Sequence, residues 1–181
     1  MITLSVENYN DISQSFYDSV LNSLQLHRLT CPCGRRGCLS IHGYYHWSVK
    51  LPDGDVVLRI CRVRCSHCGK THALLLSSMV PYSQIRLSDQ HRICSDYESG
   101  NRLSSVCDDN PSVDENNVKS VIRNYRRRWR EKLRSLRISL CPLALLVASC
   151  FTLYSSQFMQ IRIRTNQFFS QPTQPYPTGC S

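Results

Sequence analysis

The sequence predicts an α+β protein in which a small β-hairpin is followed by a helical region. Aromatic and β-branched residues flank a Pro-Asp-Gly turn at residues 52–54, a pattern typical of a hairpin. Beyond residue 87, apolar residues recur at helical spacing between capping residues and Gly-Asn or Asn-Pro breaks. The third observation is charge: 22 Lys and Arg against 13 Asp and Glu leave a formal net charge of +9, which favours a polyanionic partner.

Five parts are predicted along the chain. They are an N-terminal amphipathic helix (1–27), a hairpin domain (28–80), a helical region (87–137), an apolar C-terminal helical segment (138–170) and a flexible tail (171–181). In the first part a helix is expected over residues 10–26, capped by Asn10 or Asp11. Its apolar positions recur every four residues, at Ile12, Phe16, Val20 and Leu24.

Cysteine spacing in the hairpin domain predicts a metal site. Strands are expected at 41–51 and 56–65, with a third at 71–76. One cysteine cluster, CPCGRRGC, precedes the first strand, and another, CSHC, follows the second, so closing the hairpin would bring the clusters together. This is the layout of a zinc ribbon, since zinc takes four tetrahedral thiolate or imidazole ligands. The first residues show neither a basic region nor a continuous apolar run, so we expect no secretion signal and a reducing, cytoplasmic location, where such cysteines bind metal more readily than they form disulfides.

The expected ligands are Cys33, Cys38, Cys65 and Cys68, with Cys31 as the alternative ligand. Cys65-x-x-Cys68 has the usual knuckle spacing, whereas Cys31-x-Cys33 is shorter than usual. Three histidines are weaker candidates and are expected at the surface or beside the ligands: His42, His67 and His72. A closed set of four ligands leaves no open position for catalysis, so the Zn²⁺ is expected to be structural.

The helical region is predicted to contain three helices. A linker with Pro81 leads to a helix capped by Ser88 that ends before Gly100, and a short helix around Val106 follows. The third and longest helix is expected to start from a capping box formed by Ser112 and Glu115. This order of helices is typical of a helix-turn-helix, in which the last helix enters the major groove of DNA.

The third helix carries most of the charge. Residues 119–137 include nine basic residues against one acid, Glu131, a net +8. Polar residues near its start suit base edges, because Asn pairs with adenine and Arg or Lys with guanine: Asn116, Asn117, Lys119, Ser120 and Arg123. Later arginines are expected along phosphates: Arg126, Arg127, Arg130 and Arg134. Double-stranded DNA is therefore the expected partner, and a homodimer reading paired half-sites would fit this arrangement.

Several stretches together resemble a known family. They are CPCGRRGC, HGYY, ICRVRCSHCGKTHALL and MVPYSQI, then NPSVDENNVKSVIRNYRRRWREKL and SSQFMQIRIRTNQFF. The chain resembles, over roughly residues 28–170, a short bacterial transposase-related family of unknown function. Its front half is similar to the zinc ribbon and helix-turn-helix that open ISL3-type insertion-sequence transposases. The resemblance implies the DNA-reading part of a mobile-element protein.

The sequence departs from those transposases in its catalytic part. They continue with an RNase H-like domain whose three acidic residues bind two metal ions, but no Asp or Glu follows Glu131 in this chain. We therefore expect no enzyme and no small-molecule substrate. The expected role is a DNA-binding regulator, or an accessory to a transposase encoded elsewhere.

Two alternative hypotheses remain open at this stage. The first is a zinc-ribbon module for RNA or protein, in which Tyr44, Tyr45 and Trp47 would stack on unpaired bases, although strand aromatics are more often core or cross-strand pairs. The second is a small membrane-associated protein anchored by residues 138–154, a stretch of 17 residues. Because this stretch is short and contains Pro142, a buried helix is the preferred interpretation.

Overall fold

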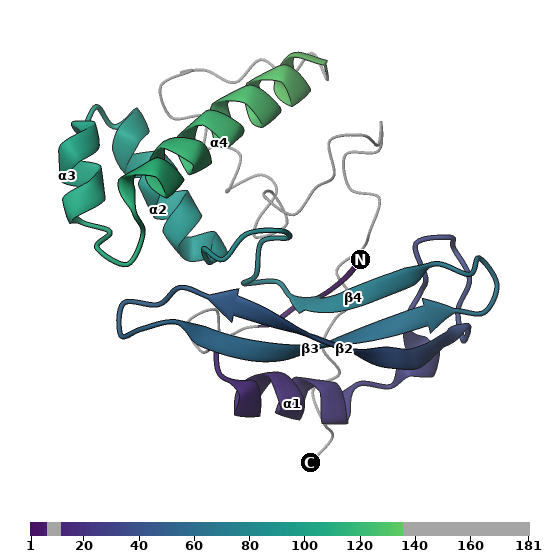
Figure 1. Ribbon diagram of the computed structural model, residues 1–181. Coiled ribbons are helices and arrows are strands. Elements are labelled where there is room, and N and C mark those ends of the chain that lie inside the picture. The colour runs from purple at the N-terminus through teal and green to yellow at the C-terminus, as the bar shows by residue number, and fades with distance from the viewer. Residues whose placement is uncertain (7–11, 136–181) are drawn as a thin grey trace.

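A four-stranded mixed sheet with helices on both sides forms the described part of the protein (Figure 1). The computed structural model describes residues 1–6 and 12–135, with the backbone alone for 128–135. The elements are, in chain order, β1 (Ile2–Leu4), α1 (Gln14–Ser23), the 3₁₀ helix η1 (Leu26–Arg28), β2 (Leu39–Val49), β3 (Val56–Cys65), β4 (Thr71–Leu76), α2 (Leu87–Glu98), α3 (Leu103–Asp108) and α4 (Glu115–Ser135). The predicted α+β class is confirmed.

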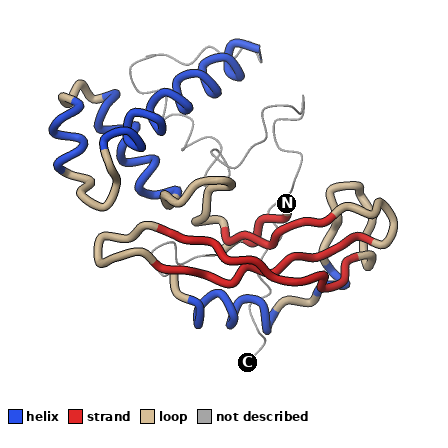
Figure 2. The backbone as a smooth tube through the Cα atoms, viewed as in Figure 1, coloured by secondary structure: helices blue, strands red, loops and turns tan. Residues whose placement is uncertain are grey.

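The strands lie in the order β1-β4-β3-β2 and form one continuous sheet in Figure 2. Strands β2 and β3 form the predicted antiparallel hairpin around residues 52–54, where Gly54 adopts a φ of 123° that favours glycine. Strand β4 is the predicted third strand, and it pairs antiparallel with β3. Strand β1 was not predicted, because three residues are too few to show an alternating pattern, and it pairs parallel to β4.

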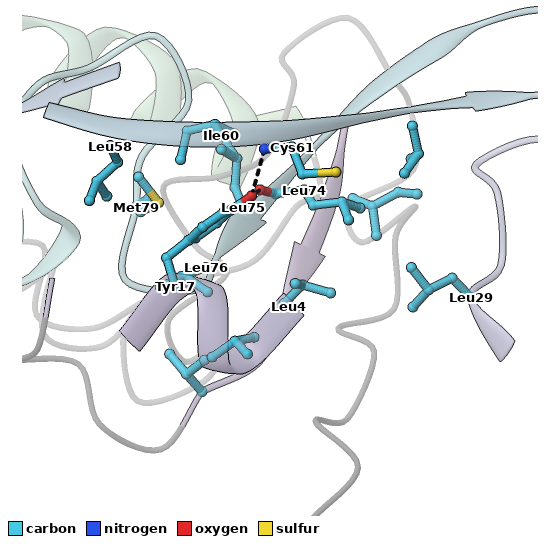
Figure 3. Packing of buried hydrophobic residues seen from close by; sticks show 14 of the residues in the cluster. Leu4, Tyr17, Leu29, Leu58, Ile60, Cys61, Leu74, Leu75, Leu76 and Met79 are labelled. Atoms are coloured by element: carbon cyan, nitrogen blue, oxygen red, sulfur yellow. Dashed lines mark hydrogen bonds between the residues drawn. The ribbon is translucent and has the colours of Figure 1, made fainter. Parts of the chain in front are cut away.

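Tyr17 on α1 joins the helix to the sheet. The ladder between β3 and β4 covers only residues 62–64 and 71–73. Next to it, the Tyr17 hydroxyl accepts a hydrogen bond from the Cys61 N–H and donates one to the Leu74 carbonyl, both at 2.9 Å (Figure 3). Tyr17 is fully buried, and burial raises the pKa of its hydroxyl. The hydroxyl therefore bridges two strands where the backbone ladder between them does not continue.

The hydrophobic core lies between the sheet and α1. Its fully buried side chains come from three strands and the helix: Leu4, Val20, Leu58, Ile60, Val63, Leu74, Leu75 and Leu76. Figure 3 shows several of these around Tyr17. Burying each large apolar side chain contributes about 1.5–3 kcal/mol, so this cluster supplies the main stabilisation of the sheet.

The predicted starts of the helices need correction. Helix α1 is capped by Ser13, whose side chain accepts the Phe16 N–H at 3.2 Å, whereas Asn10 and Asp11 lie outside the described residues. Helix α2 begins at Leu87, one residue before the predicted cap Ser88, because its first turn is held by an ion pair between Arg86 and Asp89 at 2.8 Å.

Helix α4 starts later than the predicted capping box. Asp114 is its N-cap, and the Asp114 carboxylate accepts the Asn117 N–H at 2.9 Å. This bond lowers the pKa of Asp114, and Lys50 and the Asn117 side chain add to the effect. The predicted pairing of Ser112 with Glu115 is wrong, because a carboxylate two residues further along satisfies the free N–H of the first turn.

The predictions for the end of the chain lie outside the described residues. They concern residues 136–137 of the third helix, the apolar segment 138–170 with its candidate span 138–154, and the tail 171–181. Among the helices in residues 1–6 and 12–135, none is long and apolar enough to cross a membrane.

Candidate functional site

Five cysteines gather at the end of the β2–β3 hairpin that is opposite its turn. Cys31 and Cys33 lie in the loop after η1, and Cys38 immediately precedes β2. Cys65 is the last residue of β3, and Cys68 lies in the turn before β4. Because Leu39 pairs with Cys65 in the hairpin, the two clusters come together as the sequence predicts.

Four of these sulfurs have the spacing of a metal site. The Sγ atoms of Cys31, Cys33, Cys65 and Cys68 all lie within 4.8 Å of one another. Two of the separations are 3.8 Å, between Cys31 and Cys68, and 3.9 Å, between Cys33 and Cys65. In a tetrahedral zinc site with Zn–S bonds of about 2.3 Å, the sulfurs are about 3.8 Å apart. The group could therefore bind a metal ion such as zinc.

The four-sulfur group contains Cys31 instead of the expected Cys38. The Gly34 N–H donates to the Cys31 carbonyl at 2.8 Å, and the Cys31 N–H donates to the Arg35 carbonyl at 2.8 Å. Gly34 has a φ of 90°, so the chain turns within the Cys31-x-Cys33 segment and both sulfurs join the group despite the short spacing. Cys38 lies beside the group, with its Sγ 3.3 Å from that of Cys65.

Hydrogen bonds prepare one of the sulfurs for a metal. The Cys68 N–H donates to Cys65 Sγ at 3.4 Å and lowers the pKa of Cys65 to about 6, with the neighbouring thiols adding to the shift. Burial acts in the other direction on Cys31, whose pKa it raises. Because the thiolate is the form that binds a metal, the lowered pKa of Cys65 favours metal binding, whereas the raised pKa of Cys31 opposes it.

The three candidate histidines occupy the positions expected of them. His72 is buried, with its Nε2 atom 3.5 Å from Cys31 Sγ. His67 Nδ1 lies 3.9 Å from Cys33 Sγ, and His42 is exposed on β2. None belongs to the four-sulfur group, so His67 and His72 lie beside the ligands.

Helix α4 presents a row of polar and basic side chains. Its buried face is apolar and consists of Val118, Val121, Ile122 and Tyr125. On the opposite face, spacings of four, three and four residues align a set that we call the α4 row: Asn116, Ser120, Arg123 and Arg127. All are exposed except Ser120, which is half-buried.

The other predicted DNA contacts on α4 are partly engaged within the protein. The Asn117 side chain donates to the Asp114 carboxylate, and Lys119 pairs with Glu115 at 2.5 Å. Arg126 lies over the ring of Tyr97 on α2, 5.8 Å from its centroid. The remaining two residues, Arg130 and Arg134, fall in the part of α4 that is described by its backbone alone.

The strand aromatics serve mainly in packing. Tyr45 and Trp47 are half-buried, and their ring centroids are 6.1 Å apart. The Trp47 indole N–H donates to the Ser83 carbonyl at 3.0 Å, which ties β2 to the linker. Tyr44 is 45% exposed and lies under the Arg59 guanidinium, 4.6 Å from ring centroid to carbon. Of the three rings, Tyr44 is therefore the most exposed.

The cysteine group and the helices α2–α4 lie toward opposite ends of the sheet in Figure 1. Near the turn end, Lys50 forms an ion pair with Asp114 at 3.8 Å, and its N–H donates to the Gln84 carbonyl at 2.8 Å. A metal bound by the cysteines would thus stabilise the sheet without reaching the α4 row.

A cleft of about 490 Å³ lies between α4 and loop 80–85. Two predicted DNA contacts, Asn117 and Ser120, line it. Lys50 and Tyr82 also line it, and the sequence did not predict their role, because no local pattern shows that three distant segments meet there.

Comparison of the chain with protein-family models, curated proteins and solved structures finds no match in any of the three.

Proposed function

We propose that the protein is a zinc-containing double-stranded DNA-binding protein of mobile-element origin that lacks a catalytic domain. Helices α2, α3 and α4 would act as a helix-turn-helix, and the hairpin with its cysteines as a zinc ribbon. The observation that carries the proposal is the α4 row, a largely exposed stripe along residues 116–127 of α4, opposite the buried Val118, Val121, Ile122 and Tyr125.

The chemistry of the α4 row suits DNA. Asn116 lies in the first turn of α4, where a recognition helix contacts base edges, and its amide can form two hydrogen bonds with adenine. Arg123 and Arg127 follow on the same face, where guanidinium groups would bind guanine or phosphate oxygens. Arg130 and Arg134 continue the same spacing along the helix, so we expect them to extend the phosphate contacts.

The proposed zinc ion has a structural role. Four thiolates complete its tetrahedral coordination, which leaves no position for water or substrate. The ion would join the loop after η1 to the end of β3, two segments separated by more than 30 residues. Because only the folded chain brings the four ligands together, metal binding adds to the free energy of folding, so removal of the metal by a chelator should destabilise this end of the sheet.

The mobile-element origin rests on the sequence resemblance described above. The cysteine spacings and the VPYSQ stretch, both of which resemble that family, support this origin. The order of a predicted zinc ribbon before a basic helical region supports it as well. A separate transposase and a second copy of this chain are the partners that such an origin suggests.

Salt dependence of DNA affinity tests the proposal. Fluorescence anisotropy would give the Kd of zinc-loaded protein for a 20-base-pair duplex, and for one of its single strands, over a range of salt concentrations. Each phosphate contact contributes about 0.9 to the slope of log K against log salt, so the double variant Arg123→Ala/Arg127→Ala should lower the slope by up to about two.

The matched control removes two exposed arginines outside α4, with the double variant Arg28→Ala/Arg59→Ala. It should keep the slope of the unaltered protein. Equal losses in both double variants would mean that overall charge, and not the α4 row, binds DNA. Tighter binding to the single strand than to the duplex would favour the alternative of an RNA-binding module.

A further inference from the structure

Tyr82 has an unusual position in loop 80–85. Its side chain is 88% exposed, the most exposed large hydrophobic residue in the described part of the chain. Its φ of 61° is the only positive value among the described non-glycine residues. The turn is closed by the Ser83 N–H, which donates to the Val80 carbonyl at 3.1 Å, and Pro81 occupies its second position. A turn with positive φ at its third position favours Gly or Asn, so Tyr is unfavourable there for the backbone.

The loop is held rigidly around this residue. Ser83 Oγ accepts hydrogen bonds from the Ile85 N–H at 3.1 Å and from the Gln90 side chain at 2.8 Å. Gln90 also donates to the Ile85 carbonyl at 2.9 Å, and the Trp47 indole N–H donates to the Ser83 carbonyl at 3.0 Å. A fixed loop with an exposed ring loses little conformational freedom when the ring makes a contact.

The cleft beside Tyr82 has the donors and acceptors of a nucleotide site. Its polar lining residues include Lys50, Gln84, Asn117 and Asn124. The side-chain NH2 groups of Asn117 and Asn124 each donate one hydrogen bond, to Asp114 and Ser120 respectively, and each amide has a second N–H and a carbonyl oxygen. The volume of about 490 Å³ lies within the range of small-molecule pockets.

The position of the cleft connects it to the proposed DNA surface. Ser120 belongs to the α4 row and also lines the cleft, so the cleft opens along one side of the row. A nucleotide that leaves the stack of a duplex bound on the row would enter the cleft between the Tyr82 ring and the amides of α4. Lys50, although paired with Asp114, supplies a positive charge for its phosphate.

We propose that loop 80–85 and α4 form a binding site for an unstacked nucleobase, with the Tyr82 ring stacked on the base and the amides of Gln84, Asn117 and Asn124 on its edge. This site rests on the proposed function, because it acts on DNA held by the α4 row. Base stacking on an aromatic side chain supplies affinity without requiring a particular sequence.

Two 21-base-pair duplexes test the site with full-length zinc-loaded protein. One contains a single bulged 2-aminopurine, and the other contains the same base paired with thymine. The protein should bind the bulged duplex about tenfold more tightly than the paired one, and the fluorescence of the bulged base should fall on binding as it stacks on Tyr82. Tyr82→Gly should remove both effects, whereas Tyr82→Phe, which keeps the ring, should retain them.

A thermal unfolding measurement separates loss of the ring from loss of the fold. Because glycine suits the positive φ of this turn, Tyr82→Gly should be at least as stable as the unaltered protein. Persistence of the preference for the bulged duplex in Tyr82→Gly would overturn the site. Salt-sensitive binding with no preference in the unaltered protein would also overturn it. Absence of binding to either duplex would instead overturn the proposed function.

Discussion

Replacing Cys31 and Cys38 separately by serine distinguishes the two possible ligand sets. In the structure Cys31 belongs to the four-sulfur group, and Cys38 lies outside it against Cys65. Structural zinc sites bind with about 10–16 kcal/mol, so loss of one of four similar ligands removes roughly a quarter, which is a factor of about 100 in Kd. Cys31→Ser should therefore weaken zinc binding by about 100-fold. Cys38→Ser, which keeps a hydrogen-bonding hydroxyl beside Cys65, should weaken it by less than about tenfold.

Competition with a chromophoric chelator of known zinc affinity measures both constants. Cys107→Ser is the matched control, because Cys107 lies on α3, outside the cysteine group, and its replacement changes the thiol count equally. The control should bind zinc like the unaltered protein. If Cys38→Ser lost zinc while Cys31→Ser retained it, the four-sulfur geometry would be refuted and the ligand set expected from the spacing would be correct.

Three further predictions concern the Tyr17 bridge, the turn at Gly34 and the start of α4. Tyr17→Phe leaves the buried Cys61 N–H and Leu74 carbonyl without their bridging hydroxyl, so it should lower the free energy of unfolding, measured by urea titration, by about 3 kcal/mol. The control Tyr44→Phe, at an exposed ring, should change it by less than about 0.5 kcal/mol, and equal effects of the two variants would exclude the bridge. Gly34→Ala should weaken zinc binding more than Gly34→Asn in the chelator assay, because Asn tolerates the φ of 90° better than Ala does. The reverse order would show that this turn does not position Cys31 and Cys33. Asn116→Ala should relax base preference in competition between duplexes of different sequence and leave the salt slope unchanged, and a uniform loss on all sequences would place Asn116 on phosphate.

Much of the fold and of the candidate metal site could be predicted because the patterns are local. The turn at 52–54 determines the hairpin, and the hairpin determines that the cysteines on either side of it meet. The choice between Cys31 and Cys38 could not be predicted, because it depends on the φ of Gly34 and on the turn around it. The spacing of cysteines in the sequence identifies the usual Cys-x-x-Cys knuckle, but it does not exclude a knuckle with a shorter spacing such as Cys31-x-Cys33.

The remaining differences come from contacts between distant segments. Strand β1 forms because β4 offers an edge, and the Tyr17 bridge forms where the backbone ladder between β3 and β4 ends. The cleft beside Tyr82 joins Lys50, loop 80–85 and α4, which no window of sequence contains. On α4 itself, periodicity indicated the buried face, but Asp114 and not Ser112 caps the first turn, where it also forms an ion pair with the distant Lys50.

Selection of binding sites from a random duplex library most directly tests whether this is a zinc-dependent, sequence-specific DNA-binding protein. Zinc-loaded protein and a chelator-treated sample would be compared at physiological salt. We predict an enriched motif with the zinc-loaded protein and loss of enrichment after chelation. Tight, salt-sensitive binding without any enriched motif would contradict specific recognition by α4, and an equal motif in both samples would contradict the role of the metal centre.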